Sequence, residues 1–344
     1  MTAAIALSER SRGRTAPNPN VGCIIVREGR VVGRGWTQPG GRPHAEAMAL
    51  AEAGERARGA AAYVTLEPCA HQSTRGPACA PSLAEAGVAR VVAALIDPDP
   101  RTAGRGLAVL RDAGVVVVEG VGADGARRAM AGFLTRRALG RPFVTLKLAM
   151  SLDGCIALAS GESRWITGAE ARAHAHLERA RHEAILVGRG TWDIDAPKLD
   201  ARLAGLEDRS PIRVVLSHRP HPSAAAPLPP SPDGRGKGPA AAGGGKGEGD
   251  LTYIARPEDI AHLSADHVLV EGGAQTAAAF LCTNLVDRLL LYRAPILIGG
   301  GKPGLGDIGL SDLAVAHGQW RRTDTRRLGS DTLEVYERRP CSPE

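Results

Sequence analysis

Short apolar runs, each long enough for one buried strand, alternate with helix-like segments along this chain. In the first third of the chain, the strand-like runs are CIIV, RVVGRGW, YVTL, VVAAL and VVVV, and Ala- and Leu-rich segments separate most of them. Such alternation is typical of the α/β class, in which helices cover a largely parallel sheet. The chain is therefore predicted to have an α/β fold.

The alternation runs through twice, which predicts two domains. A helical segment over residues 126–139 ends the first round, and the apolar run FVTLKLAM begins just after Arg141 and Pro142. The length of 344 residues also exceeds that of one ordinary domain. We expect one domain over residues 1–140 and a second over 141–344. Within the second, residues 219–250 are mainly Pro, Gly, Ala and Ser, a composition that predicts a disordered loop.

Composition narrows the class of function. No run of about 18 uncharged apolar residues occurs and no secretory signal is evident, so we expect a cytoplasmic protein without a membrane partner. The net charge of +6 would suit nucleic acid, but the arginines are dispersed, and a phosphorylated small molecule fits the charge equally well. Nucleic acid is therefore not the expected partner. Six scattered cysteines argue against a disulfide framework, so a clustered pair is better interpreted as metal ligands.

One cluster of metal-binding residue types is present in the first half. His44 opens a predicted helix, Cys69 follows a predicted strand, and Cys79 comes ten positions later. One imidazole and two thiolates provide three ligands for tetrahedral zinc and leave the fourth position open, as in catalytic zinc sites. A closed structural site would need a fourth ligand, and His71 is the alternative candidate for that position.

Glu46 indicates the chemistry of the open position. A carboxylate two residues after the ligand His, followed later by Pro-Cys, matches the pattern of zinc deaminases. Zinc lowers the pKa of a bound water molecule to about 7. A neighbouring carboxylate can then move protons while water replaces a ring amino group. The first half is thus predicted to be a zinc-dependent deaminase of a cytosine-like ring.

Four segments of the first half together resemble the deaminase part of the bifunctional riboflavin-biosynthesis deaminase/reductase family. They are PNPNVGCIIV from Pro17, HAE from His44, TLEPCAH from Thr65 and DPDPRTAGRGL from Asp97. The resemblance implies a cytidine-deaminase-like α/β/α sandwich. It also implies that the Asn-Pro segment contacts the substrate ring, with Asn20 preferred over Asn18, although both are ordinary turn residues beside proline. The loop from His71 to Ala78 departs from the family pattern, which keeps open the hypothesis that only the second half is active.

Segments of the second half resemble the reductase part of the same family, so the resemblance covers nearly the whole chain outside residues 219–250. They are TLKLAMSLDG from Thr145, GESRWIT from Gly161, DIDAPKLDAR from Asp193 and VEGGAQTAAAF from Val270. No G-x-G-x-x-G sequence follows the opening apolar run of this half, so a Rossmann domain is not predicted for it. The resemblance implies instead a dihydrofolate-reductase-like α/β domain that binds NADPH. The Gly272–Gly273 pair after an apolar run is either a simple turn or a phosphate-binding turn.

The resemblance also assigns residues in this half. Dinucleotide contacts are implied for Ala149, Trp165, Thr191, Asp195, Ser217 and the segment 273–279, which starts with Gly273, Ala274, Gln275 and Thr276. Substrate contacts are implied for Ser163, Arg179, Leu199, Arg202 and Glu271. Guanidinium groups bind phosphate through paired hydrogen bonds, so Arg179 and Arg202 suit a sugar phosphate. Lys147 and Asp153 are both candidates for assisting hydride transfer.

The resulting hypothesis is a riboflavin-biosynthesis enzyme that uses zinc and NADPH. The resemblance implies hydrolytic deamination of 2,5-diamino-6-(5-phosphoribosylamino)pyrimidin-4-one, then reduction of its ribosyl chain to ribityl, in a homodimer or higher homo-oligomer. One alternative is a nucleic-acid deaminase with an accessory C-terminal domain, although aromatic residues for base stacking are scarce. Another is a zinc-stabilised scaffold, but a structural zinc site has no use for Glu46.

Overall fold

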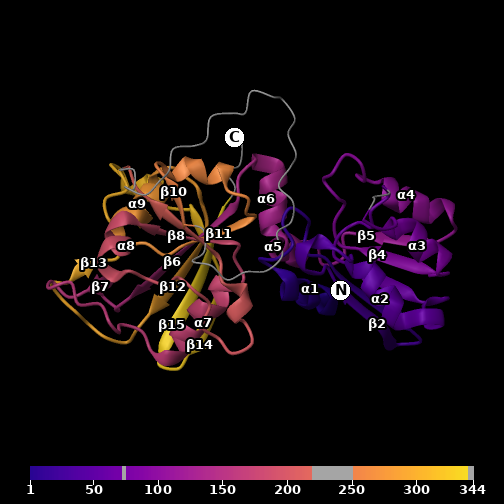
Figure 1. The fold of residues 1–344 in the computed structure, drawn as a ribbon, viewed down its shortest axis with the longest axis horizontal. Coiled ribbons are helices and arrows are strands. Elements are labelled where there is room, and N and C mark those ends of the chain that lie inside the picture. Colours follow the sequence, from indigo (N-terminus) through magenta and orange to yellow (C-terminus); the bar gives the residue numbers. More distant parts are fainter. Residues whose placement is uncertain (72–74, 219–250, 340–344) are drawn as a thin grey trace.

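The computed structural model describes residues 1–71, 75–218 and 251–339, so the loop predicted over residues 219–250 lies outside the described residues. Figure 1 shows two large sheets, each with helices against it, and places helices α5 and α6 in the region between them. The strands of the first third of the chain form one sheet, and strands after residue 142 form the other. The predicted α/β class is confirmed.

The first sheet has five strands in the order β2-β1-β3-β4-β5. Their bounds are Gly22–Arg27 (β1), Arg30–Trp36 (β2), Ala61–Val64 (β3), Arg90–Ala93 (β4) and Val116–Glu119 (β5). β1 is antiparallel to β2 and β3, whereas β3, β4 and β5 are parallel to one another. The segments that follow β3 and β4 therefore leave the sheet at the same edge.

Helices cover both faces of this sheet. They are α1 (Thr2–Ser8), α2 (Ala45–Ala53), α3 (Cys79–Glu85), α4 (Arg105–Asp112), α5 (Ala123–Ala129) and α6 (Ala131–Leu139), with short 3-10 turns at Glu9–Ser11 (η1), Pro39–Gly41 and Gly54–Ala57. A Cβ at Gly22 would lie 1.9 Å from the Ala4 carbonyl oxygen of α1. A Cβ at Gly35 would lie 1.9 Å from the Ala45 carbonyl oxygen of α2. Because Gly35 pairs with Cys23, the neighbour of Gly22, the two glycines face opposite sides and let α1 and α2 pack closely on the two faces.

The single helix predicted over residues 126–139 is in fact two helices. α5 and α6 are separated at Met130, whose φ of −104° and ψ of 21° leave the helical region. Just beyond it, the Gly132 amide donates a hydrogen bond to Nε2 of His267 at 3.1 Å. The Gly132 N–H group therefore binds the second half of the chain instead of a carbonyl oxygen of α5.

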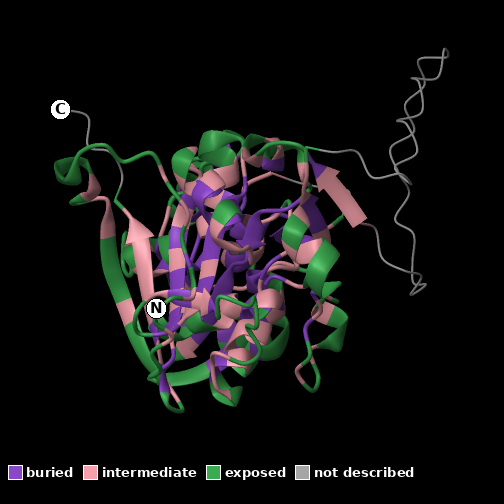
Figure 2. Ribbon diagram, turned by 90° about the vertical axis from the view of Figure 1, so that its left-hand side faces the viewer, coloured by how far each residue is buried: buried purple, intermediate pink, exposed green. Residues whose placement is uncertain are grey.

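The second sheet has eight strands in the order β10-β9-β8-β11-β6-β12-β15-β14. Their bounds are Phe143–Met150 (β6), Ala184–Gly188 (β8), Ile212–Leu216 (β9), Leu251–Ile254 (β10), His267–Val270 (β11), Val286–Arg293 (β12), Trp320–Leu328 (β14) and Asp331–Arg338 (β15). The first six in this order are parallel, and β15 and β14 are antiparallel additions. β8 and β11 are buried along their whole length, as expected for central parallel strands with helices on both faces (Figure 2).

The helices of the second half connect these strands. They are α7 (Ala169–Arg179), α8 (Arg189–Asp195), α9 (Ala274–Cys282) and α10 (Leu313–Ala316), with 3-10 turns at Glu207–Arg209 and Pro257–His262; a small separate sheet pairs β7 (Cys155–Ala157) with β13 (Lys302–Pro303). α8 follows β8 and α9 follows β11, so both helices start at the carboxyl edge of the parallel strands. Ligands bind at this edge in open α/β sheets.

The two halves are joined by direct contacts as well as by the chain itself. Arg136 of α6 donates to the carbonyl oxygens of Ala261 and Leu263 in the second half, at 2.9 and 2.8 Å. The link between α6 and β6 turns at Gly140, whose φ of 68° is left-handed and favours glycine. None of the helices within the described residues combines the length and apolar character needed to span a bilayer.

Candidate active sites

The predicted zinc ligands come together in the first half. His44 immediately precedes α2, Cys69 lies beyond the carboxyl end of β3, and Cys79 is the first residue of α3. Nδ1 of His44 lies 3.3 Å from the Cys79 sulfur and 3.6 Å from the Cys69 sulfur. Tetrahedral zinc with bonds of about 2.0–2.3 Å separates its ligand atoms by roughly 3.3–3.8 Å. The donor set and its spacing therefore fit zinc.

His71 does not join this group. Its Nδ1 lies 3.3 Å from the Thr102 hydroxyl oxygen. Over residues 1–71, 75–218 and 251–339, the ligand atoms that gather within 4.8 Å of one another come from His44, Cys69 and Cys79. Three ligands leave one position of a tetrahedral ion open, which is the arrangement of a catalytic site rather than a closed structural one.

Glu46 is in the first turn of α2 and only 4% exposed. Its carboxyl group lines the same cavity as His44 and Cys69. Burial raises the pKa of Glu46 to about 7. A group of this pKa can both accept and donate a proton near neutral pH, which is what general acid–base catalysis requires.

The cavity beside the metal ligands has a volume of about 370 Å³, within the range of small-molecule sites. Its walls combine the Phe133 ring with four guanidinium groups, which belong to Arg42, Arg75, Arg101 and Arg137. Carboxylates also line the cavity, and Arg101 and Arg137 both pair with Asp99, at 2.6 and 3.4 Å. An apolar surface beside arginines suits a planar ring that carries a phosphate. Sequence reasoning missed these arginines because they come from separate loops and α6, and no spacing relates them.

Glu67 organises the wall made by the DPDPRTAGRGL segment. It is 3% exposed. Its two carboxylate oxygens accept four backbone N–H groups, from Asp97, Gly104, Gly106 and Leu107, at 2.8 to 3.2 Å. The segment that carries cavity residues Asp97 and Asp99 is therefore held against the end of β3 by one buried carboxylate.

Asn18, not Asn20, lines the cavity. Asn20 is 3% exposed, and its Nδ2 donates to the carbonyl oxygens of Ser8 and Ala129 at 3.2 and 3.0 Å. The preference for Asn20 as the ring contact is therefore corrected, because its amide is used inside the domain to connect α1 with α5. Asn18 becomes the candidate for that contact.

In the second half, two of the predicted residues, Arg179 and Lys147, contact the carboxylate of a third, Glu271. Nε and Nη2 of Arg179 donate to the two oxygens of Glu271 at 2.7 and 2.9 Å. Nζ of Lys147 lies 3.7 Å from Oε2 of Glu271. Burial by itself would raise the pKa of Glu271, but the charges of Lys147 and Arg179 outweigh it and lower that pKa to about 2. The carboxylate is therefore ionised and fixes both cations at the carboxyl edge of the sheet.

The other predicted substrate residues lie in different environments. Arg202 has a 58% exposed side chain, and its Nε lies 3.1 Å from the Asp200 carboxylate. The Asp200 carbonyl oxygen accepts from Arg179 at 3.2 Å, which connects this segment to the carboxylate cluster. Ser163 is exposed. The Leu199 side chain is 3% exposed and packs in the core, and the substrate contact predicted at this position stays a prediction.

Four predicted cofactor residues lie at or just after the carboxyl ends of neighbouring parallel strands. They are Ala149 near the end of β6, Thr191 after β8, Ser217 after β9 and Gly273 after β11. Gly273 immediately precedes α9, whose first N–H groups have no partner within the helix. Helix N-termini of this kind bind phosphate groups. The arrangement suits a dinucleotide that lies along this edge.

The Thr276 side chain has a packing role. It is 8% exposed, whereas the neighbouring Gln275 is exposed. A Cβ at Gly188 would lie 2.1 Å from Thr276 Oγ1, and one at Gly272 would lie 2.4 Å from Thr276 Cβ. Thr276 therefore packs α9 against the ends of β8 and β11, and a cofactor contact at this position stays a prediction. Ala274 remains at the start of the helix.

Trp165 and Asp195 lie at the surface beside arginines. Trp165 is 67% exposed, and the guanidinium carbon of Arg172 lies 4.7 Å from the centre of its ring. The Asp195 carboxylate lies 3.7 Å from Nη2 of Arg164. These contacts place both predicted cofactor residues on exposed segments with cationic neighbours.

Asp153 is used to hold a loop. Its carboxylate accepts from the Ser151 hydroxyl at 2.5 Å and from the Gly299 amide at 2.7 Å. The Ser151 and Gly299 bonds lower the pKa of Asp153 to about 2, so this group has no proton to donate near neutral pH. Of the two candidates for assisting hydride transfer, Asp153 is therefore less suited than Lys147 to donate a proton. The loop that it holds, GGGKPG from Gly299, has G-x-G-x-x-G spacing but leads into β13 rather than a helix.

A His-Cys-Cys metal site with an adjacent carboxylate, on an α/β/α sandwich joined to a second α/β domain, defines a zinc-dependent deaminase of the cytidine-deaminase type with an attached domain. Residues 1–95 match the family described as the cytidine and deoxycytidylate deaminase zinc-binding region. Residues 142–228 and 258–333 match the RibD C-terminal domain. These two matches cover the two halves separately.

Full-length relatives contain both parts. The chain is 39% identical to the riboflavin biosynthesis protein RibD of Escherichia coli over 96% of each chain, and 36% identical to that of Aquifex aeolicus over 98% of this chain and 97% of the relative. The solved structure of Acinetobacter baumannii RibD is 34% identical with a TM-score of 0.79 over 98% of both chains. The Thermotoga maritima diaminohydroxyphosphoribosylaminopyrimidine deaminase/5-amino-6-(5-phosphoribosylamino)uracil reductase is 31% identical with a TM-score of 0.80 over 98% of this chain and 97% of that chain. The chain belongs to the RibD family.

Proposed function

We propose that this chain catalyses two consecutive steps of riboflavin biosynthesis, a zinc-dependent deamination in the first half and an NADPH-dependent reduction in the second. The observation that carries the proposal is the complete site in each half of a chain that matches RibD proteins over its length. The substrate is 2,5-diamino-6-(5-phosphoribosylamino)pyrimidin-4-one, and the ribosyl chain of its deaminated product is reduced to ribityl. The comparisons do not favour the alternative of a nucleic-acid deaminase.

In the first half, His44, Cys69 and Cys79 would hold a zinc ion, which would supply activation of the attacking water. Glu46 would accept a proton from the attacking water and donate one to the departing ammonia. Asn18 contacts the ring, and the arginines of the cavity wall bind the phosphate. Water adds and ammonia leaves, so no oxidant or reductant is needed for this step.

In the second half, NADPH supplies the hydride when bound. The chain's own residues position the sugar and provide the proton that the ring oxygen needs as the ribosyl ring opens. Lys147 is the better candidate for this proton because its ammonium group sits beside Glu271 at the carboxyl edge of β6. Two donors of Arg179 already bind Glu271, so Arg202 is the better candidate for binding the phosphate.

The proposal extends to the partner, the cellular compartment, the assembly and the domain bounds. The partner is a phosphorylated pyrimidine ribotide, without nucleic acid or membrane as a partner. The protein acts in the cytoplasm as a homodimer or higher homo-oligomer, and residues 1–140 and 141–344 are the deaminase and reductase domains. Size-exclusion chromatography with light scattering tests the oligomeric state, and expression of the two fragments separately tests the boundary.

Product analysis of the purified, zinc-loaded chain with the diamino ribotide tests the function. Ammonia is expected without NADPH, and the ribityl product only with NADPH. Glu46→Gln should abolish ammonia release, whereas Glu55→Gln, an exposed carboxylate in the turn after α2, should leave it unchanged. Deamination of cytidine in RNA with no turnover of the ribotide would refute the proposal.

A further inference from the structure

A second cavity, of about 410 Å³, lies between the two halves and shares no lining residue with either site described above. We call it the interdomain cavity. Its walls come from α1, η1 and α5 of the first half and from α7, β12, β14 and β15 of the second. Any ligand that fills it contacts both halves at once.

The charges that line the interdomain cavity do not cancel. Five arginines and four acidic residues line it. Each acid pairs with one arginine of the lining, in the pairs Arg12–Glu9 (3.6 Å), Arg181–Glu178 (3.1 Å), Arg288–Glu337 (3.0 Å) and Arg326–Asp324 (2.6 Å). Glu337 also lies 4.0 Å from Arg321, which does not line the cavity. The fifth arginine, Arg128 of α5, supplies the surplus positive charge.

Two of these arginines also have donors that are not used. The Arg12 side chain is 6% exposed, and its Nε and Nη2 find no hydrogen-bond partner among the described residues. Nε of Arg288 also finds no hydrogen-bond partner among the described residues, and the Arg288 side chain is 10% exposed. A buried donor without an acceptor destabilises the folded chain, and more so when it is charged. An acceptor in the cavity would remove this cost.

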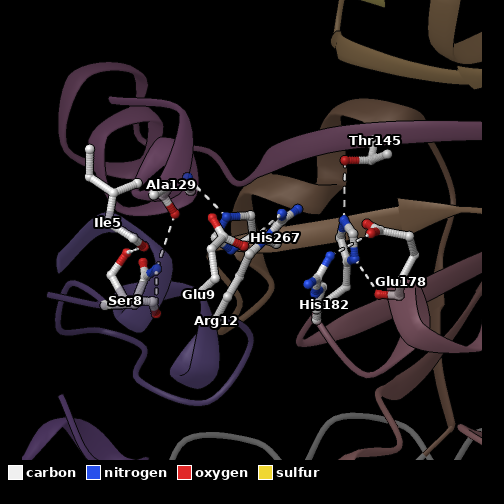
Figure 3. Close-up of polar contacts among 12 residues, drawn as sticks. Ile5, Ser8, Glu9, Arg12, Ala129, Thr145, Glu178, His182 and His267 are labelled. Atoms are coloured by element: carbon white, nitrogen blue, oxygen red, sulfur yellow. Dashed lines mark hydrogen bonds and ion pairs between the residues drawn. The ribbon is translucent and has the colours of Figure 1, made fainter. Parts of the chain in front are cut away.

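Figure 3 shows how Arg12 reaches across the boundary. Glu9 and Arg12, from the first half, lie in the same region as His267, His182 and Glu178 of the second half. The charge of Arg12 is close enough to help lower the pKa of Glu178 to about 2, against the effect of burial. The charge of Arg12 therefore acts on a residue of the second half, although Arg12 itself is part of the first half.

We propose that the interdomain cavity binds a phosphate group, held by Arg12, Arg128 and Arg288. A phosphate anion is attracted by the surplus positive charge of Arg128, and its oxygens can accept from the guanidinium donors that have no other partner. The cavity volume lies in the range of small-molecule sites, so either inorganic phosphate or a phosphate monoester fits the chemistry. Because the donors come from both halves, the bound group fastens the two domains to each other.

The test compares two neighbouring arginines of α5 in the full-length, zinc-loaded chain. Arg128 lines the cavity, whereas Arg127 pairs with Asp124 at 2.9 Å and does not line it. Both are exposed, so Arg128→Gln and Arg127→Gln should fold alike. Calorimetry would measure binding of inorganic phosphate and, separately, of ribose 5-phosphate. Phosphate that binds at the catalytic sites contributes equally to both variants and drops out of the comparison.

For the probe that occupies the cavity, the dissociation constant should rise about tenfold in Arg12→Gln and several-fold in Arg128→Gln, with no change in Arg127→Gln. The same probe should raise the melting temperature of the wild type more than that of Arg128→Gln. If inorganic phosphate shows this pattern, the free ion is the ligand; if only ribose 5-phosphate shows it, the ligand is a monoester. Equal affinities of wild type, Arg128→Gln and Arg127→Gln for both probes would overturn the proposal and leave water as the occupant.

Discussion

Arg179 and Glu271 are joined by two parallel hydrogen bonds, 2.7 and 2.9 Å long, although they are 92 residues apart in the chain. Their side chains are 14% and 9% exposed. Lys147 completes the cluster from the adjacent strand. One buried carboxylate thus fixes two cations at the edge of the sheet where the sugar phosphate is proposed to bind.

Replacing Glu271 should therefore affect stability and reduction together. Glu271→Ala leaves two cations poorly compensated, so the free energy of unfolding should fall by about 3–5 kcal/mol, and the reductase rate should fall while ammonia release persists. Glu52→Ala removes the partner of exposed Arg34 and should cost less than about 1 kcal/mol. Urea unfolding of both variants measures the difference. Equal losses would mean that the Glu271 cluster is no stronger than a surface ion pair.

Removing zinc should affect one activity only. The His44–Cys69–Cys79 site belongs to the first half, whereas the proposed reductase residues lie in the second. A chelator, or Cys79→Ser, should abolish ammonia release and leave NADPH oxidation with the deaminated substrate within about twofold. Cys282→Ser, at an exposed cysteine outside both sites, should retain both activities and bind zinc normally. Metal analysis and the two assays check this, and loss of NADPH oxidation on chelation would contradict it.

The Glu67 carboxylate should be a strong stabiliser of the deaminase half. Glu67→Ala would leave four backbone donors without their acceptor, so we expect the free energy of unfolding to fall by more than about 3 kcal/mol. The wall that carries Asp97 should loosen and raise the deaminase KM. Glu85→Ala, at an exposed position of α3, should stay within about 0.5 kcal/mol of the wild type. A Glu67→Ala variant as stable as Glu85→Ala would show that these hydrogen bonds contribute little.

His182 should make stability depend on pH. Burial, with the nearby charge of Arg12, lowers the pKa of His182 to about 3, whereas an unfolded His has a pKa of about 6.5. Between these values the unfolded chain binds one more proton here than the folded chain, so stability falls as pH falls through this window, by about 1.4 kcal/mol per pH unit.

Replacing His182 should reduce that dependence. His182→Gln should show a shallower decline in the free energy of unfolding between pH 6.5 and 5, even if the variant is less stable at pH 8. His317→Gln changes an exposed histidine and should keep the wild-type slope. Denaturant titrations at several pH values measure the slopes, and identical slopes for the wild type and His182→Gln would rule out this contribution.

Much of the fold and the metal site could be predicted from the sequence because the relevant signals are local. Strand and helix periodicity gave the α/β class, and the residue types at His44, Cys69 and Cys79 match the ligands that zinc prefers. The break at Met130 could not be predicted, because it depends on a hydrogen bond to His267 across the domain boundary. Periodicity contains no information about such a contact.

The direction of individual side chains also depends on distant parts of the chain. Asn18 and Asn20 are equivalent in sequence terms, and packing of α1 on α5 decides which of them reaches the cavity. In the sequence, Asp153 resembles a catalytic acid because it lies close to Lys147. In the structure its carboxylate accepts a hydrogen bond from the Gly299 amide, which is far along the chain. Thr276 is buried only because Gly188 and Gly272 let α9 come close.

The measurement that most directly tests the central claim, that one chain contains two independent catalytic sites, is a crossed assay of two single variants. Glu46→Gln should oxidise NADPH with the deaminated ribotide but release no ammonia from the diamino ribotide. Lys147→Met should release ammonia at the wild-type rate but oxidise NADPH at least 100-fold more slowly, on the order of 2.7 kcal/mol in barrier. A mixture of the two variants should convert the diamino ribotide to the ribityl product. Loss of both activities in either variant would contradict the account.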